Sequence, residues 1–150
     1  MDKNQIEALI QDVKENESTA NVHKPYNKVM GRGADFEVEY KFDIAPQLEG
    51  VKPGQGMRCD FLYEGDEPKT DGIHMIWPEL LDSAGNIIED KTIEPDSQGR
   101  ATMWILSSSA RESIHRERIK VGTKGYWVIG SSILAKVTVT KILSLFENEE

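Results

Sequence analysis

The residues of this sequence that could do chemistry begin with His74, which follows a loop carrying Glu64, Asp66, Glu67 and Asp71. Hard cations prefer carboxylate oxygens, and a histidine nitrogen can complete a metal site. The carboxylates do not follow the alternating ligands and central glycine of a calcium loop, and no second histidine stands at ligand spacing. We therefore expect a solvated acidic loop, with a metal-dependent enzyme acting at His74 as a remote alternative.

The possible nucleophiles are Cys59 and the serines at 107–109. Cys59 alternates with Met57 and Phe61, so we expect its thiol on a buried strand face, where it behaves as a small hydrophobic group. The serines stand near His115, but no elbow glycines surround them and no acid partner for the histidine is evident. We expect them in a turn or at a strand end. The sequence predicts no catalytic residue, no cofactor and no bound metal.

One stretch of the chain is rich in basic side chains. Arg116, Arg118, Lys120 and Lys124 follow one another closely, and an aromatic pair stands at residues 126–127. Cations beside aromatic rings can contact a phosphate or an acidic protein. Two glutamates interrupt the stretch, and mixed charge is typical of ordinary surface. We take these four side chains as the best candidates for binding a partner.

Composition limits the classes of function. The chain has 150 residues, the length of a single domain, and a net charge of −8. An acidic surface repels phosphate backbones, which disfavours a general coat on DNA or RNA. A single cysteine excludes an intrachain disulfide, and no segment approaches the ~20 apolar residues of a membrane span or resembles a secretory signal. We expect a cytoplasmic protein without a membrane partner.

The elements that must position these residues change character along the chain. Ile6, Leu9, Ile10 and Val13 form the apolar stripe of one amphipathic helix, expected over residues 2–14. We expect a polar linker to follow it and to complete an N-terminal segment of residues 1–32. A β domain would then occupy residues 33–146, and an acidic tail residues 147–150.

The β domain is predicted from alternation of apolar and polar residues, which is clearest from Phe36 to Phe42. Hairpin punctuation separates further short runs and no helical pattern appears between them. We expect strands at residues 36–42, 57–63, 73–77, 86–88, 101–106, 118–121 and within 126–145.

Once the strands are placed, residues 35–143 resemble the third, C-terminal domain of elongation factor Tu. The resemblance rests on residues 35–40, which match the family's opening strand, and on residues 56–63, which match a later strand at its glycine, arginine and phenylalanine. Residues 129–137 are similar to the family's closing strand, with small residues kept small. Residues 118–125 resemble the strand and glycine loop before it.

The resemblance implies a closed six-stranded antiparallel β-barrel. In the family this domain works beside a GTP-binding domain, but no phosphate-binding Gly-x-x-x-x-Gly-Lys-Ser/Thr segment occurs here, which argues against GTP binding. The family domain also contacts tRNA. Here Asp60 stands where the family has a glutamine, and its charge would oppose phosphate, whereas Lys124 and Gly125 remain possible contacts.

We therefore expect a non-catalytic module that binds a protein partner or a second copy of itself. The alternative is a translation-linked protein that binds tRNA or the ribosome through residues 116–124, and steep salt dependence would distinguish it.

Overall fold

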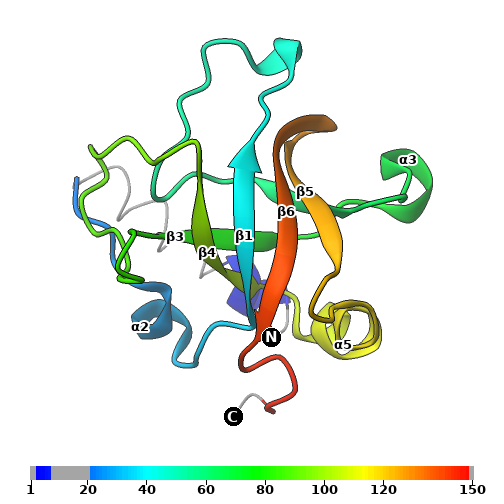
Figure 1. Ribbon diagram of the computed structural model, residues 1–150. Helices are drawn as coiled ribbons and strands as arrows, with labels where there is room; N and C mark the ends of the chain where they lie inside the picture. Colours follow the sequence, from blue (N-terminus) through cyan, green and yellow to red (C-terminus); the bar gives the residue numbers. More distant parts are fainter. Residues whose placement is uncertain (1–2, 8–20, 149–150) are drawn as a thin grey trace.

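The protein, described here as a computed structural model over residues 3–7 and 21–148, is mainly β (Figure 1). Six antiparallel strands form one sheet in the order β2-β5-β6-β1-β4-β3. The strands are β1 Phe36–Phe42, β2 Asp60–Tyr63, β3 Ile76–Leu81, β4 Gln98–Ile105, β5 Lys124–Ile129 and β6 Ser132–Ile142. The sheet curves into an open half-barrel, so the predicted mainly β class is confirmed.

The helical segments are short. Residues 3–7 are helical, and the remainder of the helix expected at residues 2–14 lies outside the described residues. The other segments are α2 Tyr26–Met30, the 3-10 turn η1 Pro46–Leu48, α3 Pro68–Asp71, α4 Ser108–Ala110, the π-helix η2 Arg111–His115 and α5 Arg116–Arg118. Among the described residues, no helix is long and apolar enough to cross a lipid bilayer.

The core lies on the concave face of the sheet and follows the alternation of β1. Phe36, Val38 and Tyr40 are buried in the main apolar cluster, whereas Glu39 and Lys41 are exposed. β1 pairs with β4 on one side and β6 on the other, so both of its backbone edges are hydrogen-bonded. The predicted strand at residues 36–42 is confirmed in full.

The two edges of the sheet meet at one point. Phe61 of β2 and His74 exchange backbone hydrogen bonds of 2.9 Å in each direction. At Leu80 the β3 edge is instead covered by Gln55, whose side-chain amide accepts from Leu80 N at 2.8 Å and donates to Leu80 O at 3.0 Å. Pro78 is tolerated because β3 is an edge strand and needs no donor there. The closed barrel is not confirmed.

The segment expected to be a linker packs against the sheet. Tyr26 of α2 contacts the rings of Trp77 and Trp104 in a second apolar cluster. His23 is buried, and its Nε2 lies 2.6 Å from a carboxylate oxygen of Glu79. His23 therefore belongs to the packed part of the molecule, because a buried carboxylate on β3 gives its imidazole a partner.

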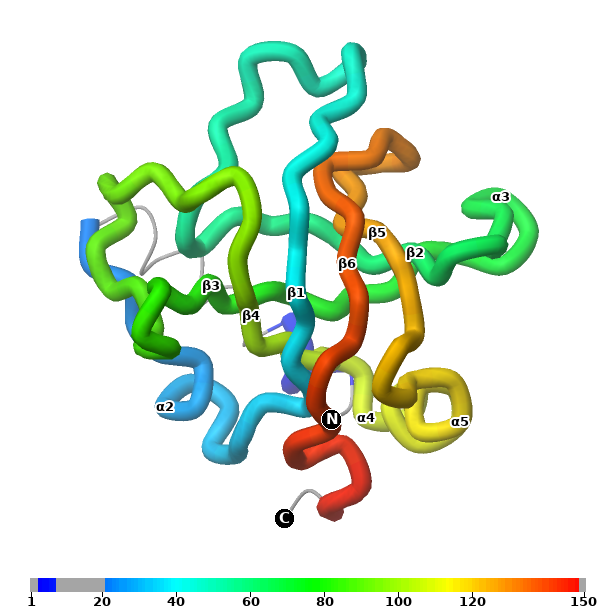
Figure 2. Tube along the Cα trace, viewed as in Figure 1, coloured from blue at the N-terminus to red at the C-terminus, as the bar shows by residue number. Residues whose placement is uncertain are grey.

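The expectation of a strand at residues 118–121 is wrong, and so is the expectation that no helix lies between the strands. Residues 108–118 form one continuous helical run beside the lower ends of β5 and β6 (Figure 2). Ser107, expected in a turn or at a strand end, caps this run by accepting from the Ala110 amide at 3.3 Å. The inward positions of the run are Arg111 and His115. Because these are polar, the sequence carried no apolar stripe.

The bounds of the other predicted strands also differ from expectation. Only Asp60–Tyr63 of residues 57–63 is strand, and the run expected at 73–77 lies further along as β3. Ile87, expected within a strand, makes an isolated bridge to Leu81. The long apolar run at 126–145 is a hairpin of β5 and β6, because Gly130 has a positive φ of 61° and allows the turn.

Candidate functional site

The basic stretch is partly consumed by the fold. Arg116 donates from Nε to Leu145 O at 2.8 Å and from Nη2 to Glu147 O at 2.9 Å. Arg118 donates to both carboxylate oxygens of Asp66 at 2.7 and 3.0 Å. Both guanidinium groups therefore already have acceptors, which leaves less positive charge for a partner than the sequence indicated.

The other candidates of this stretch lie in different environments. Lys120 and Lys124 are exposed, on either side of the turn at Gly122. Gly125 is buried in β5, and a Cβ there would come within 2.5 Å of the Phe61 ring. Gly125 thus serves packing, because a side chain there would overlap Phe61. Lys120 and Lys124 remain the accessible candidates for binding a partner. Asp60, which we expected to oppose RNA, begins β2 and is half-buried, and burial raises its pKa.

A cluster of aromatic and imidazole rings lies beneath Arg118. Its guanidinium carbon is 3.8 Å from the Tyr63 ring centroid, and the Tyr63 hydroxyl lies 2.7 Å from His115 Nδ1. The His115 ring makes an edge contact with His74 at 4.7 Å between centroids. Burial, followed by His74 and Arg118, lowers the pKa of His115 to about 3. Burial also lowers the pKa of His74 and raises that of Tyr63.

This cluster lacks the features of a catalytic or metal site. The neutral His115 is 1% exposed, so a substrate could not reach it without movement of the surrounding chain. Asp66, the acidic-loop residue near His74, is held by Arg118, and that hydrogen bond lowers its pKa. Within residues 3–7 and 21–148, no group of three or more His, Cys, Asp or Glu side chains could hold a metal ion. The rings pack the end of the half-barrel.

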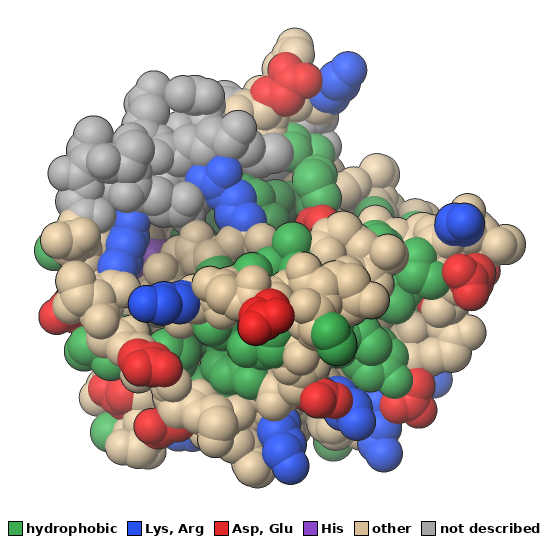
Figure 3. All heavy atoms as spheres, turned by 90° about the horizontal axis from the view of Figure 1, so that it is seen from above, with side chains coloured by type: hydrophobic (Ala, Val, Ile, Leu, Met, Phe, Trp, Pro, Cys, Tyr) green, Lys and Arg blue, Asp and Glu red, His purple; other side chains and the backbone are tan. Residues whose placement is uncertain are grey.

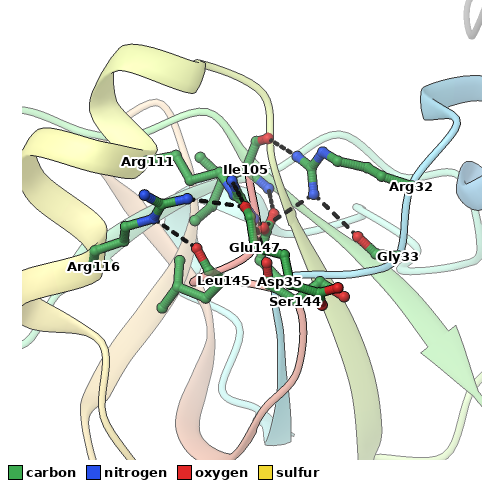
Figure 4. Close-up of polar contacts among 9 residues, drawn as sticks. All are labelled: Arg32, Gly33, Asp35, Ile105, Arg111, Arg116, Ser144, Leu145 and Glu147. Atoms are coloured by element: carbon green, nitrogen blue, oxygen red, sulfur yellow. Dashed lines mark hydrogen bonds and ion pairs between the residues drawn. The ribbon is translucent and has the colours of Figure 1, made fainter. Parts of the chain in front are cut away.

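A buried ion pair that the sequence did not reveal joins three parts of the chain (Figure 4). The Asp35 carboxylate, which has no exposed surface, accepts from Arg111 Nε at 2.7 Å and from Arg32 Nη1 at 3.0 Å. Its second oxygen accepts from the Ile105 amide at 2.7 Å. Asp35 immediately precedes β1, so the pair fixes the start of the central strand to the helical run.

The same guanidinium groups hold the end of the chain. Arg111 donates to the carbonyls of Ser144 and Glu147, the latter at 2.6 Å, and Arg116 binds Leu145 O as described above. Figure 4 shows these arginines reaching from the helical run toward the segment after β6. All three carbonyls belong to backbone outside the sheet, where side chains must supply the donors. This network therefore ties the end of the chain and the helical run to the start of β1.

The expected role of Cys59 in packing agrees with its position. The thiol is 2% exposed within the main core, and burial, with a further contribution from Asp60, raises its pKa. A protonated, inaccessible thiol is not a nucleophile.

A groove of about 700 Å³ lies between residues 44–57 and 91–94. It is lined by Ile44, Val51 and Ile93, whose exposed fractions of 41%, 36% and 51% are high for aliphatic side chains. We call it the loop groove. Figure 3 looks onto this end of the half-barrel, where apolar side chains lie among acidic and basic ones. Its volume falls in the ~300–1,000 Å³ range of ligand sites.

Two lysines also line the loop groove. Lys52 is exposed, and Lys91 is partly buried with an ammonium nitrogen that has no hydrogen-bond partner among the described residues. The sequence analysis did not single out this groove. The available signal was the isolated aliphatic residues Ile44, Val51 and Ile93 in otherwise polar loops.

Comparison with known proteins finds no match: no known family describes any part of the chain, and no curated protein is significantly similar to it.

Proposed function

We propose that the chain is a non-catalytic protein-binding module whose loop groove binds an extended segment of a partner protein. The observation that carries the proposal is the convergence of three exposed aliphatic side chains, Ile44, Val51 and Ile93, on one recess of about 700 Å³. Contiguous exposed apolar surface is costly in water and is typical of interaction sites. Loops carried by a rigid sheet are also the usual place for binding residues.

The charges of the loop groove select the chemistry of the partner. Lys52 and Lys91 line it together with one carboxylate, Glu94. An ammonium group without a hydrogen-bond partner, such as that of Lys91, is unfavourable in a partly buried position. A carboxylate on the incoming segment would supply that partner. We therefore propose a segment that combines aliphatic side chains with an acidic residue.

The alternative of RNA binding relied on residues 116–124. It is less favoured because Arg116 and Arg118 already bind acceptors within the protein, which leaves Lys120 and Lys124. Two separated lysines supply little of the phosphate neutralisation that non-specific RNA affinity requires.

We also propose that the half-barrel is a variant of the closed barrel of the elongation factor Tu third domain. The antiparallel six-stranded sheet and the bridge between Phe61 and His74 support the idea. A closed barrel predicts that the amides of Phe61 and His74 exchange with solvent as slowly as those of β1. Exchange at the rate of a loop would contradict closure.

Peptide selection tests the protein-binding function. A display library of random extended peptides is selected against the full chain, and selected peptides are measured against Ile93→Asp and Val121→Asp. Val121 is 67% exposed and lies outside the groove, so its substitution is the matched control. We expect peptides with aliphatic and acidic residues that lose affinity at least ~10-fold, or ~1.4 kcal/mol, only with Ile93→Asp.

Two results would overturn the proposal. One is a set of selected peptides that bind Ile93→Asp as well as the unmodified protein. The other is salt-sensitive binding of a short RNA that survives Ile93→Asp and is lost when Lys120 and Lys124 are replaced by glutamate, which would favour the RNA alternative.

A further inference from the structure

A second hollow lies beside the loop groove, between residues 91–96, the end of β3 and the start of β4. Its volume is about 410 Å³, and its aliphatic wall includes Leu81, Ile88 and Ile93. We call it the acidic hollow. Ile93 and Glu94 line both recesses, so the segment 91–96 forms a wall between them.

The acidic hollow takes its name from its charged groups, which are four carboxylates and one guanidinium: Asp82, Glu89, Glu94, Asp96 and Arg100. Asp82 is partly satisfied, because its Oδ1 accepts from two backbone amides of its own turn at 2.9 Å. The Arg100 guanidinium lies 4.0 Å from the carboxylate of Glu37 on β1, which is outside the hollow. Part of the positive charge of Arg100 is therefore balanced there. The net field inside the hollow therefore favours a cation.

Tyr40 borders this hollow, and its hydroxyl has no hydrogen-bond partner among the described residues. Tyr40 is only 2% exposed, its ring packs at 5.0 Å from that of Trp127, and it lines the hollow. A Cβ on Gly99 would lie 2.8 Å from its hydroxyl oxygen. Burial, and then the charge of Asp96, raises the pKa of Tyr40, and both residues line the hollow. The hydroxyl oxygen is therefore available to accept a hydrogen bond from a ligand in the hollow.

We propose that the acidic hollow binds a primary alkylammonium group, with Tyr40 as its acceptor. The ammonium would donate to the Tyr40 hydroxyl oxygen and to Asp96, and its alkyl chain would pack on Leu81 and Ile88. The carboxylates surround an aliphatic recess and do not converge, since no three such ligands in the described part of the chain could hold a metal. That arrangement suits an organic cation with a carbon chain. This site shares Ile93 and Glu94 with the loop groove, but its ligand differs and the inference does not rest on the proposed function.

The experiment is an NMR titration of the full chain with 1,5-diaminopentane, followed by amide shifts. The matched control ligand is 1,5-pentanediol, which has the same length without charge. We expect saturable shifts concentrated in residues 82–100 with the diamine and none with the diol. Tyr40→Phe and Asp96→Asn should each weaken binding about 10-fold, the loss of one charged hydrogen bond. Glu39→Gln, an exposed carboxylate of β1 outside the hollow, should not change it.

The result that would overturn the proposal is the absence of saturable shifts, or shifts spread over surface carboxylates with an affinity unchanged by Tyr40→Phe. Because Asp96 is exposed, Asp96→Asn remains informative if Tyr40→Phe fails to fold. A blocked Gly-Gly-Lys-Gly-Gly peptide distinguishes the source of the ammonium. Tighter binding of the peptide indicates a lysine of a partner protein, and tighter binding of the diamine indicates a free polyamine.

Discussion

The buried imidazole of His115 makes the stability of the protein depend on pH in mildly acidic solution. Burial, with His74 and Arg118 as further causes, lowers the His115 pKa from 6.5 to about 3. In the unfolded chain the pKa returns to its ordinary value. Between the two values the unfolded chain therefore binds a proton that the folded protein does not bind. The free energy of unfolding must fall as the pH drops through this window.

The size of the effect follows from the shift. For each pH unit below the pKa of His115 in the unfolded chain, the free energy of unfolding falls by about 1.4 kcal/mol. His115 alone should therefore lower the free energy of unfolding by about 2 kcal/mol between pH 7 and pH 5. By pH 3 the loss reaches about 4 kcal/mol. The His74 pKa is lowered as well and acts in the same direction. Carboxylates with lowered pKa values, such as Asp66, contribute only below about pH 4.

Urea unfolding at pH 7, 6 and 5, followed by tryptophan fluorescence, measures this dependence. His115→Gln keeps an amide near the Tyr63 hydroxyl but cannot titrate, so it should lose about 2 kcal/mol less than the unmodified protein over this range. Tyr63→Phe is the control. It removes the hydrogen bond but leaves the imidazole buried, so the pH dependence should persist. Equal slopes for His115→Gln and the unmodified protein would refute the reasoning.

Three further predictions concern the fold. Asp35→Asn should lower the free energy of unfolding, measured by urea titration, by about 3 kcal/mol or more, because Arg111 would keep a buried, uncompensated charge. The control is Asp43→Asn, at an exposed ion pair, which should change this free energy by less than about 0.5 kcal/mol. Gly125→Ala should cost about 1–3 kcal/mol because a Cβ would overlap a core ring of β2; thermal unfolding checks this, and an unperturbed melting temperature would contradict it. Gln55→Ala should lower the free energy of unfolding by about 1–3 kcal/mol and speed hydrogen exchange of the Leu80 amide, because the backbone of Leu80 would lose its side-chain partner. Unchanged exchange would show that Gln55 does not protect this edge.

The strands whose two faces differ in environment were predictable from the sequence. β1 separates buried Phe36, Val38 and Tyr40 from exposed Glu39 and Lys41, so the period of two is visible in the residue types. β3 is buried along its whole length and contains Pro78, so neither alternation nor proline chemistry marked its bounds. Strands such as β1 are enough to predict a mainly β fold. Strands such as β3 do not reveal from the sequence where they begin and end.

The helical run at residues 108–118 escaped prediction for a physical reason. Its inward face is occupied by Arg111 and His115, which are buried through partners distant in sequence, Asp35 and Tyr63. A pattern of apolar residues cannot reveal a face that is satisfied by ion pairs and hydrogen bonds. Ser107 was the remaining signal, as a helix cap.

The surroundings of the binding candidates could not be predicted from the sequence for a related reason. A count of charges does not show that Arg116 and Arg118 bind acceptors within the protein, because those acceptors are distant carbonyls and Asp66. The loop groove depends on how residues 44–57 and 91–94 meet in space, and loops that are far apart in sequence carry no periodic signal of their contact.

The affinity of one selected peptide for the loop groove tests the proposed function most directly. Fluorescence anisotropy of the labelled peptide is measured with the unmodified protein, with Ile93→Asp and with Val121→Asp at moderate salt. We predict a loss of at least ~10-fold with Ile93→Asp and unchanged affinity with Val121→Asp. Equal affinity for all three proteins would show that the exposed aliphatic side chains of the groove do not bind the partner.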